Sequence, residues 1–215
     1  MISTVIFDLD GLLTDTEPLH CASWRQTLAG IGVELSEAEF CDHWIRAGLE
    51  IKDFVRLRGL VHDPEALRTA KLALYTTMLE TMLRPMPGAI ALIEALHGRK
   101  RIALATSSFR ATVDLILERL RLRRYFEAIA VHESVTRLKP HPDVFLHVAE
   151  RLGVSPSECV VLEDAEKGVL AAHAAGMKVI AVPTPHTRGN DFSRATRVVS
   201  SLEHVTLELL DSLTI

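Results

Sequence analysis

In the stretch Val5-Ile6-Phe7-Asp8-Leu9-Asp10-Gly11, a short apolar run is followed directly by two acidic residues, the pattern of a buried strand that ends at a polar site. Similar apolar runs occur at residues 101–105, 159–162 and 178–182, and a weaker one at residues 128–131. Runs of this length with few polar interruptions are typical of strands that are buried on both faces of a parallel sheet.

Amphipathic helical patterns separate these runs, at residues 89–96, 111–122, 143–152 and 165–175. The last of these ends at Gly176, a residue type that often terminates helices. Strands that alternate with helices at this spacing predict right-handed βαβ units. We therefore expect an α/β fold whose core is a Rossmann-like, doubly wound parallel sheet.

Residues 17–83 break the alternation, because this segment contains no convincing strand pattern. It contains helix-like blocks at residues 18–30, 36–47, 51–60 and 64–83, and Ser36 with Glu39 forms a capping-box pattern. The sequence thus predicts an all-helical insert at residues 16–85, and a catalytic core made of residues 1–15 and 86–215.

The composition excludes several classes of protein. The chain has 215 residues, of which 48% are hydrophobic, and its net charge is −4, so a nucleic-acid-binding surface is not expected. Its three cysteines fit no zinc spacing, and we expect them to be buried, reduced thiols. We see no signal peptide and no apolar run near the ~20 residues that cross a membrane. A cytoplasmic protein that does not interact with membranes is the expectation.

Polar residues that can carry chemistry follow the ends of the predicted strands. Asp8 and Asp10 follow the first strand, Thr106-Ser107-Ser108 the second, and Glu163-Asp164 the fourth, while Lys139 lies in the loop after the weaker strand. Ligands of open α/β sheets bind beyond the carboxyl ends of the strands. We therefore expect these residues to lie at one edge of the sheet.

Several carboxylates at one edge repel each other unless a cation lies among them. Their oxygens suit Mg²⁺, whose coordination is commonly completed by phosphate oxygens. A carboxylate can attack phosphorus, a second acid can transfer protons, and a lysine can neutralise the charge that develops. The hydroxyl of Thr106 and backbone N–H groups at the start of a helix can hold phosphate oxygens.

These motifs together resemble the haloacid dehalogenase-like hydrolase superfamily, in its β-phosphoglucomutase-like and sugar-phosphatase-like branch. The four matching motifs are residues 8–16, Thr106-Ser107, residues 139–142, and Glu163-Asp164-Ala165 with Gly168. The resemblance extends to about Val182. It implies that the helical insert is a cap over the active site.

The resemblance also implies a role for each matching residue. Asp8 would be the nucleophile and a ligand of Mg²⁺, and Asp10 would be the general acid/base whose backbone carbonyl also binds the metal. Thr106 and the Ser107 amide would bind phosphate, and Lys139 would neutralise charge. Glu163 and Asp164 would hold the metal, Asp164 more directly.

Structural roles are the alternative for these residues. Asp8 and Asp10 could be turn residues, and Thr106-Ser107-Ser108 or Glu163-Asp164 could cap the helices that follow them. Thr16 and His20 match substrate-proximal positions, although His20 could equally be a surface histidine of a helix. We expect His141 to fill a loop position.

Substrate choice in the family depends on the cap, here residues 48–52. The expected reaction is hydrolysis of a small phosphorylated metabolite, such as a sugar phosphate, by a monomer or weak dimer. A β-phosphoglucomutase is the alternative, but the arginine that would hold a second phosphate is replaced by Ile51. Asp10 disfavours a dehalogenase. A catalytically silent binding module is a remote alternative, because none of the key residues is missing.

Overall fold

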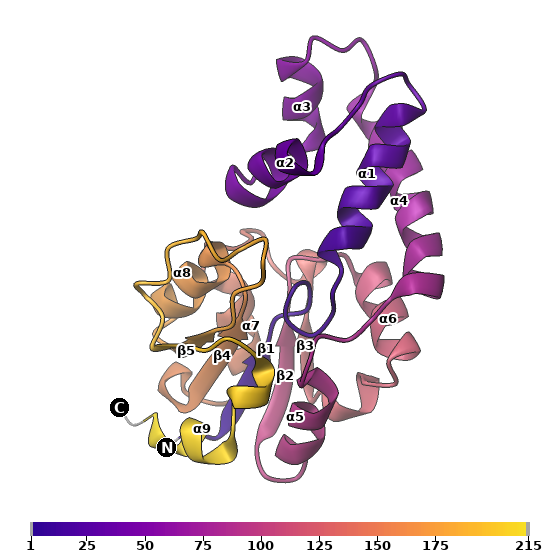
Figure 1. Ribbon diagram of the computed structural model, residues 1–215. Helices are drawn as coiled ribbons and strands as arrows, with labels where there is room; N and C mark the ends of the chain where they lie inside the picture. The colour runs from indigo at the N-terminus through magenta and orange to yellow at the C-terminus, as the bar shows by residue number, and fades with distance from the viewer. Residues whose placement is uncertain (1, 214–215) are drawn as a thin grey trace. The chain divides into compact units, whose positions relative to one another are not determined.

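The computed structural model describes residues 2–213 and divides them into two compact units (Figure 1). One unit contains residues up to Asp15 together with those from Arg84 onward, and the other contains Thr16–Leu83. The first is built around a parallel sheet and the second is helical.

A six-stranded parallel sheet with the order β3-β2-β1-β4-β5-β6 forms the centre of the larger unit. Its strands are β1 (Thr4–Phe7), β2 (Arg101–Ala105), β3 (Ala128–Ala130), β4 (Cys159–Glu163), β5 (Lys178–Ala181) and β6 (Arg197–Val198). The first strand in sequence is central and pairs with both β2 and β4. The predicted Rossmann-like α/β fold is confirmed.

Helices cover both faces of this sheet (Figure 1). They are α5 (Ala89–Leu96), α6 (Arg110–Arg119), α7 (Asp143–Leu152), α8 (Glu166–Ala174) and α9 (Leu207–Ser212), with short 3₁₀ turns η2 (Arg123–Tyr125), η3 (His132–Ser134), η4 (Pro156–Glu158) and η5 (Leu202–His204). Side chains of α7 and α8 pack in one cluster with alternate residues of the strands, including Ile6, Ala103 and Val161. Because successive strand residues point to opposite faces, their neighbours Val5, Ile102 and Val160 face the other side. This double burial explains why the strands appear as continuous apolar runs.

The predicted helix at residues 111–122 is shorter than expected and begins earlier. Helix α6 ends at Arg119, and the next residues form a turn in which Arg121 has a positive φ of 56°. Leu120 and Leu122 therefore extend the apolar pattern beyond the helix itself, and Leu122 is buried. Apolar periodicity alone does not reveal where a helix ends.

The helical unit contains α1 (Glu17–Ala29), α2 (Glu37–Phe40), η1 (Cys41–Arg46), α3 (Ile51–Leu57) and α4 (Pro64–Met82). The capping box at the start of α2 is confirmed, because the Ser36 hydroxyl accepts from the Glu39 N–H and the Glu39 carboxylate accepts from the Ser36 N–H. The predicted single helix over residues 36–47 is wrong in detail. It changes from α-helix to π-helix at Cys41, where Trp44 stacks on Trp24 and Phe40.

Two further expectations concern cysteines and membranes. All three cysteines are thiols outside any disulfide, and Cys21 and Cys159 are buried, whereas Cys41 is only half-buried. Over residues 2–213, none of the helices has both the length and the apolar character needed to cross a membrane.

Candidate active site

The carboxyl ends of β1 and β4 bring three acidic residues together. Phe7 pairs with Leu162, so Asp8 and Glu163 occupy neighbouring positions where the two strands end. The backbone N–H of Asp8 donates to the carbonyl of Leu162 at 3.1 Å. One carboxylate oxygen from each of Asp8, Glu163 and Asp164 lies within 4.8 Å of the others, and all three residues are buried.

Lys139 connects these acids from the loop that follows β3. Its ammonium Nζ donates to Oδ1 of Asp8 at 2.5 Å, to Oε1 of Glu163 at 2.7 Å and to the carbonyl of Ala105, at the end of β2, at 3.0 Å. The Nζ atom also lies over the ring of Phe145, 4.8 Å from the ring centroid. Lys139 precedes a cis proline, Pro140. Through its three hydrogen bonds, the Lys139 ammonium joins the ends of β1, β2 and β4.

The electrostatics of this cluster follow from its burial. Burial opposes the charge of Lys139, but the carboxylates of Asp8 and Glu163 outweigh it and raise the pKa of the ammonium above its ordinary value. Burial also raises the pKa of Glu163, with Asp8 adding to the rise and Lys139 opposing it. Three carboxylates against one ammonium leave a formal excess of two negative charges. A divalent cation would balance that excess.

Two glycines make room for the carboxylates. Gly11 has a φ of +77°, and a Cβ atom there would lie 2.4 Å from Oδ2 of Asp164. A Cβ on Gly168, in the first turns of α8, would lie 1.8 Å from Oε1 of Glu163. A side chain at either position would occupy the space of an acid. The other oxygen of Glu163 accepts from the backbone N–H groups of Asp164 and Ala165 at 3.0 and 3.1 Å, which fixes its orientation.

The segment after β2 holds the predicted hydroxyl residues. Thr106 is buried, and its hydroxyl accepts from the N–H of Ser108 at 3.0 Å, so it supports the segment locally. Ser107 is half-buried beside it. The hydroxyl of Ser108 donates to Oδ2 of Asp10 at 2.5 Å, across 98 residues of sequence. Ser108 had no assigned role in the sequence, because its partner depends on the pairing of β1 with β2.

Thr16 and His20, predicted to bind substrate, belong to the helical unit. The Thr16 carbonyl accepts from the N–H of His20 at the start of α1. The His20 ring stacks on Tyr75, with centroids 4.1 Å apart, and its Nδ1 accepts from Nζ of the buried Lys71 at 2.7 Å. Sequence reasoning missed Lys71, a cation on the inner face of α4, because its partner lies 51 residues away. His141 is exposed, in a loop position as expected.

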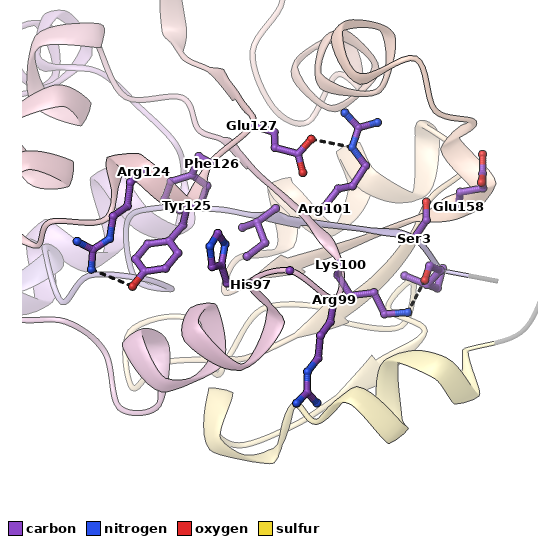
Figure 2. A pocket seen from close by; sticks show the side chains of 13 residues that line it. Ser3, His97, Arg99, Lys100, Arg101, Arg124, Tyr125, Phe126, Glu127 and Glu158 are labelled. Atoms are coloured by element: carbon purple, nitrogen blue, oxygen red, sulfur yellow. Dashed lines mark hydrogen bonds and ion pairs between the residues drawn. The ribbon is translucent and has the colours of Figure 1, made fainter.

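A hollow of about 940 Å³ lies at the opposite, amino end of the strands (Figure 2). Two of the cations around it, Lys100 and Arg101, have internal partners. Lys100 donates to the Ile2 carbonyl and to Asp211, both at 2.6 Å, and Arg101 pairs with Glu127 at 2.9 Å. These contacts stabilise the edge of the sheet and leave the acidic cluster as the candidate site.

The chain is similar to several characterised proteins. It is 36% identical over 179 residues to fructose-1-phosphate phosphatase YqaB of Escherichia coli K12, covering 83% of this chain and 95% of the relative. It is 33% identical over 214 residues to hexitol phosphatase B of the same organism, covering 95% of each. The crystal structure of CbbY from Rhodobacter sphaeroides in complex with phosphate aligns with a TM-score of 0.85 and 28% identity, over 98% of this chain and 100% of that one.

The family model for haloacid dehalogenase-like hydrolases matches residues 2–176, which include both strand ends that carry the acids and the lysine between them. The helical unit, Thr16–Leu83, interrupts the sheet-bearing unit after β1. The chain is therefore an enzyme of the haloacid dehalogenase-like hydrolase family.

Proposed function

We propose that this enzyme is a Mg²⁺-dependent phosphatase that hydrolyses a small sugar phosphate through an aspartyl-phosphate on Asp8. The observation that carries the proposal is the buried ammonium of Lys139, held between the carboxylates of Asp8 and Glu163. A lysine in this position can neutralise charge on the nucleophile and on the phosphoryl group as the group is transferred.

The first half-reaction forms the covalent intermediate. A carboxylate oxygen of Asp8 attacks phosphorus, the bond between phosphorus and the ester oxygen breaks, and Asp10 donates a proton to the departing oxygen. The alcohol leaves and the phosphoryl group remains on Asp8. The contact from Ser108 holds the carboxylate of Asp10 near the end of β2, where the Thr106-Ser107 segment would bind phosphate oxygens.

The second half-reaction restores the enzyme. Asp10, now ionised, accepts a proton from water as the water oxygen attacks phosphorus, and the bond between phosphorus and Asp8 breaks. Phosphate is released, Asp8 is again a carboxylate and Asp10 is again protonated. Each proton that Asp10 gives in the first step is thus recovered in the second.

The acids fit a magnesium site in their chemistry and charge. Asp8, Glu163 and Asp164 provide hard oxygen ligands within 4.8 Å of one another, and the formal excess of two negative charges matches one divalent ion. We assign the backbone carbonyl of Asp10 as a further ligand. When bound, Mg²⁺ would supply positive charge to the phosphoryl oxygens and to the nucleophile.

The substrate class follows from the relatives. The two relatives are a fructose-1-phosphate phosphatase and a hexitol phosphatase. We therefore propose a monophosphate of a sugar or sugar alcohol, with Thr16 and His20 as candidate substrate contacts. Cysteines that form no disulfide fit the reducing cytoplasm, which we propose as the location of the enzyme.

Phosphate release from a panel of sugar and sugar-alcohol phosphates, with and without Mg²⁺, tests this proposal. We expect the wild type to release phosphate only with the metal, and Asp8→Asn to release none. Asp114→Asn, which removes an exposed acid on α6 of the same unit, is the matched control and should retain the wild-type rate. Phosphate release by Asp8→Asn at the control rate would overturn the assignment of the nucleophile.

The same assay separates hydrolysis from the mutase alternative. With glucose 1-phosphate as substrate, a phosphatase yields free phosphate and glucose, whereas a mutase yields glucose 6-phosphate. Glucose 6-phosphate as the main product would replace hydrolysis by phosphoryl transfer between hydroxyl groups of the sugar.

A further inference from the structure

Phe109 is an exposed aromatic residue at the start of helix α6. It directly follows the Thr106-Ser107-Ser108 segment, and 47% of its surface is exposed to solvent. It is the N-cap residue of α6, with φ −69° and ψ 148°. N-cap positions favour Ser, Thr, Asp and Asn, whose side chains accept hydrogen bonds from the first N–H groups of the helix. A phenylalanine there gives up this hydrogen bond.

A residue from another loop replaces the missing cap. The carboxylate of Glu133, in η3, accepts from the N–H of Arg110 through both oxygens, at 3.1 and 3.0 Å. A negative charge at this end also interacts favourably with the helix dipole. Because Glu133 caps the helix, the side chain at position 109 is released from the capping role.

The ring of Phe109 rests on a defined support. It stacks on the imidazole of His132, with centroids 4.1 Å apart and an angle of 28° between the planes. The backbone N–H of His132 donates to the carbonyl of Ser108 at 2.9 Å. This hydrogen bond fixes the position of His132 relative to the residue that precedes Phe109. One face of the ring is therefore held, while much of the side chain stays accessible.

This accessible ring is one residue away from the contact to the proposed general acid. Ser108 donates to Oδ2 of Asp10, and Asp10 gives its proton to the ester oxygen of the leaving group. The carbon atoms bonded to that oxygen must then lie near Asp10. The nearest exposed apolar group along this segment is Phe109.

A single exposed apolar side chain is common on protein surfaces and needs no special function. Two observations distinguish Phe109 from this ordinary case. The helix cap has been transferred to Glu133, and the ring is stacked on a histidine that is hydrogen-bonded to the adjacent residue. In the described part of the sheet-bearing unit, the other large exposed hydrophobic residues are aliphatic, namely Leu146, Leu170 and Val198.

We propose that Phe109 is a specificity-determining residue whose ring contacts the carbon skeleton of the leaving group. This inference rests on the proposed phosphatase function and deepens it. The favoured substrates are phosphomonoesters whose leaving group presents C–H or aromatic surface next to the ester oxygen, as a sugar ring or an aryl group does. An aromatic face binds such surfaces through dispersion and the burial of apolar area.

The test compares substrates that share the phosphoryl group but differ in the leaving group. Steady-state kcat and KM are measured for the best sugar monophosphate of the panel, for p-nitrophenyl phosphate and for acetyl phosphate, whose leaving group is too small to cover a ring. The readout is the ratio of kcat/KM for each large substrate to kcat/KM for acetyl phosphate. This ratio cancels effects on phosphoryl binding and on the amount of active enzyme.

For Phe109→Ala we expect this ratio to fall about five- to tenfold for both large substrates, mainly through a higher KM. Phe109→Tyr keeps the ring and should restore the ratio to within about twofold of the wild type. Leu146→Ala removes another exposed apolar side chain from the same unit and should leave the ratio unchanged. Thermal unfolding of each variant reports whether it is folded.

A ratio for Phe109→Ala that equals the wild-type ratio would overturn the inference while leaving the proposed function intact. If activity toward all three substrates is lost equally, the ratio is also unchanged, and the ring only supports the phosphate-binding segment. A wild-type enzyme that releases phosphate from none of the substrates would instead overturn the proposed function itself.

Discussion

The ammonium of Lys139 donates a hydrogen bond to Oδ1 of Asp8 at 2.5 Å, although 131 residues separate the two in sequence. Both side chains are almost completely buried, with exposures of 2% and 10%. The same ammonium also pairs with Glu163, so a single positive charge serves two buried carboxylates. The stability and activity of the site therefore depend on the charge of each of these three side chains.

Removing that charge should destabilise the protein as well as inactivate it. Lys139→Met leaves two buried carboxylates without their cation, and we expect the free energy of unfolding in EDTA to fall by about 3–5 kcal/mol. Urea denaturation monitored by circular dichroism measures the loss. Lys167→Met, at an exposed position on α8, is the control and should change stability by less than about 0.5 kcal/mol. A similar, small effect for both variants would contradict the buried ion pair.

Metal removal should lower stability through the same cluster. A ligand present at 100 times its Kd stabilises the folded state by about 2.7 kcal/mol, so saturating Mg²⁺ should raise Tm by roughly 5–10 °C over EDTA. Asp164→Asn should abolish this shift and also raise the Tm in EDTA, because it removes one of the mutually repelling acids. Asp114→Asn should keep the wild-type shift. An Asp164→Asn protein that Mg²⁺ still stabilises would exclude Asp164 as a ligand.

Gly168 should control metal binding without touching the metal. In Gly168→Ala the new methyl group would lie 1.8 Å from Oε1 of Glu163, so the carboxylate must move. We expect the Mg²⁺ concentration for half-maximal activity to rise about 10- to 100-fold. Gly189→Ala is the matched control, since a Cβ atom there meets no heavy atom within 4 Å. Equal Mg²⁺ dependence in both variants would show that Glu163 can be displaced without consequence.

Cys159 should resist modification in the native state. Burial is the main cause that raises the pKa of its thiol to about 11, well above the usual value of about 8.5. The neutral thiol is therefore favoured in the folded state. Its contribution to stability is complete below about pH 8.5 and is lost progressively as the pH rises from there through about 11. At pH 8.5 we expect Cys159 to react with iodoacetamide at least tenfold more slowly than the half-buried Cys41. Mass spectrometry of peptides from the labelled native protein measures both rates, and faster labelling of Cys159 would contradict this assignment.

The central strands and most of the helices could be predicted because their signals are local. β1 and β4 are continuous apolar runs, and helices α5 and α7 begin and end where their apolar periodicity does. β6 was missed because it has only two residues, Arg197 and Val198, and both are exposed. The change to π-helix at Cys41 was missed because periodicity does not distinguish it from α-helix.

The acids and Lys139 could be predicted as neighbours because parallel strands end at one edge of the sheet. Contacts that a side chain makes with a residue far away in the sequence could not be predicted in this way. The bond from Ser108 to Asp10, the cap that Glu133 gives to Arg110 and the pair of Lys71 with His20 join residues 98, 23 and 51 positions apart. No local pattern encodes such pairs, because they depend on how separate elements meet.

The central place of β1 has a consequence for the synthesis of the chain. Its partner strand β4 begins at Cys159, so the ribosome must add about 150 residues before the sheet can close around the nucleophile. At ordinary elongation rates of about 5–20 residues per second, that delay is roughly 8–30 s. For this time one edge of an apolar strand lacks its hydrogen-bonding partner on the nascent chain. The arrangement that places Asp8 beside Glu163 therefore leaves an unpaired, aggregation-prone strand edge on the nascent chain until β4 is made.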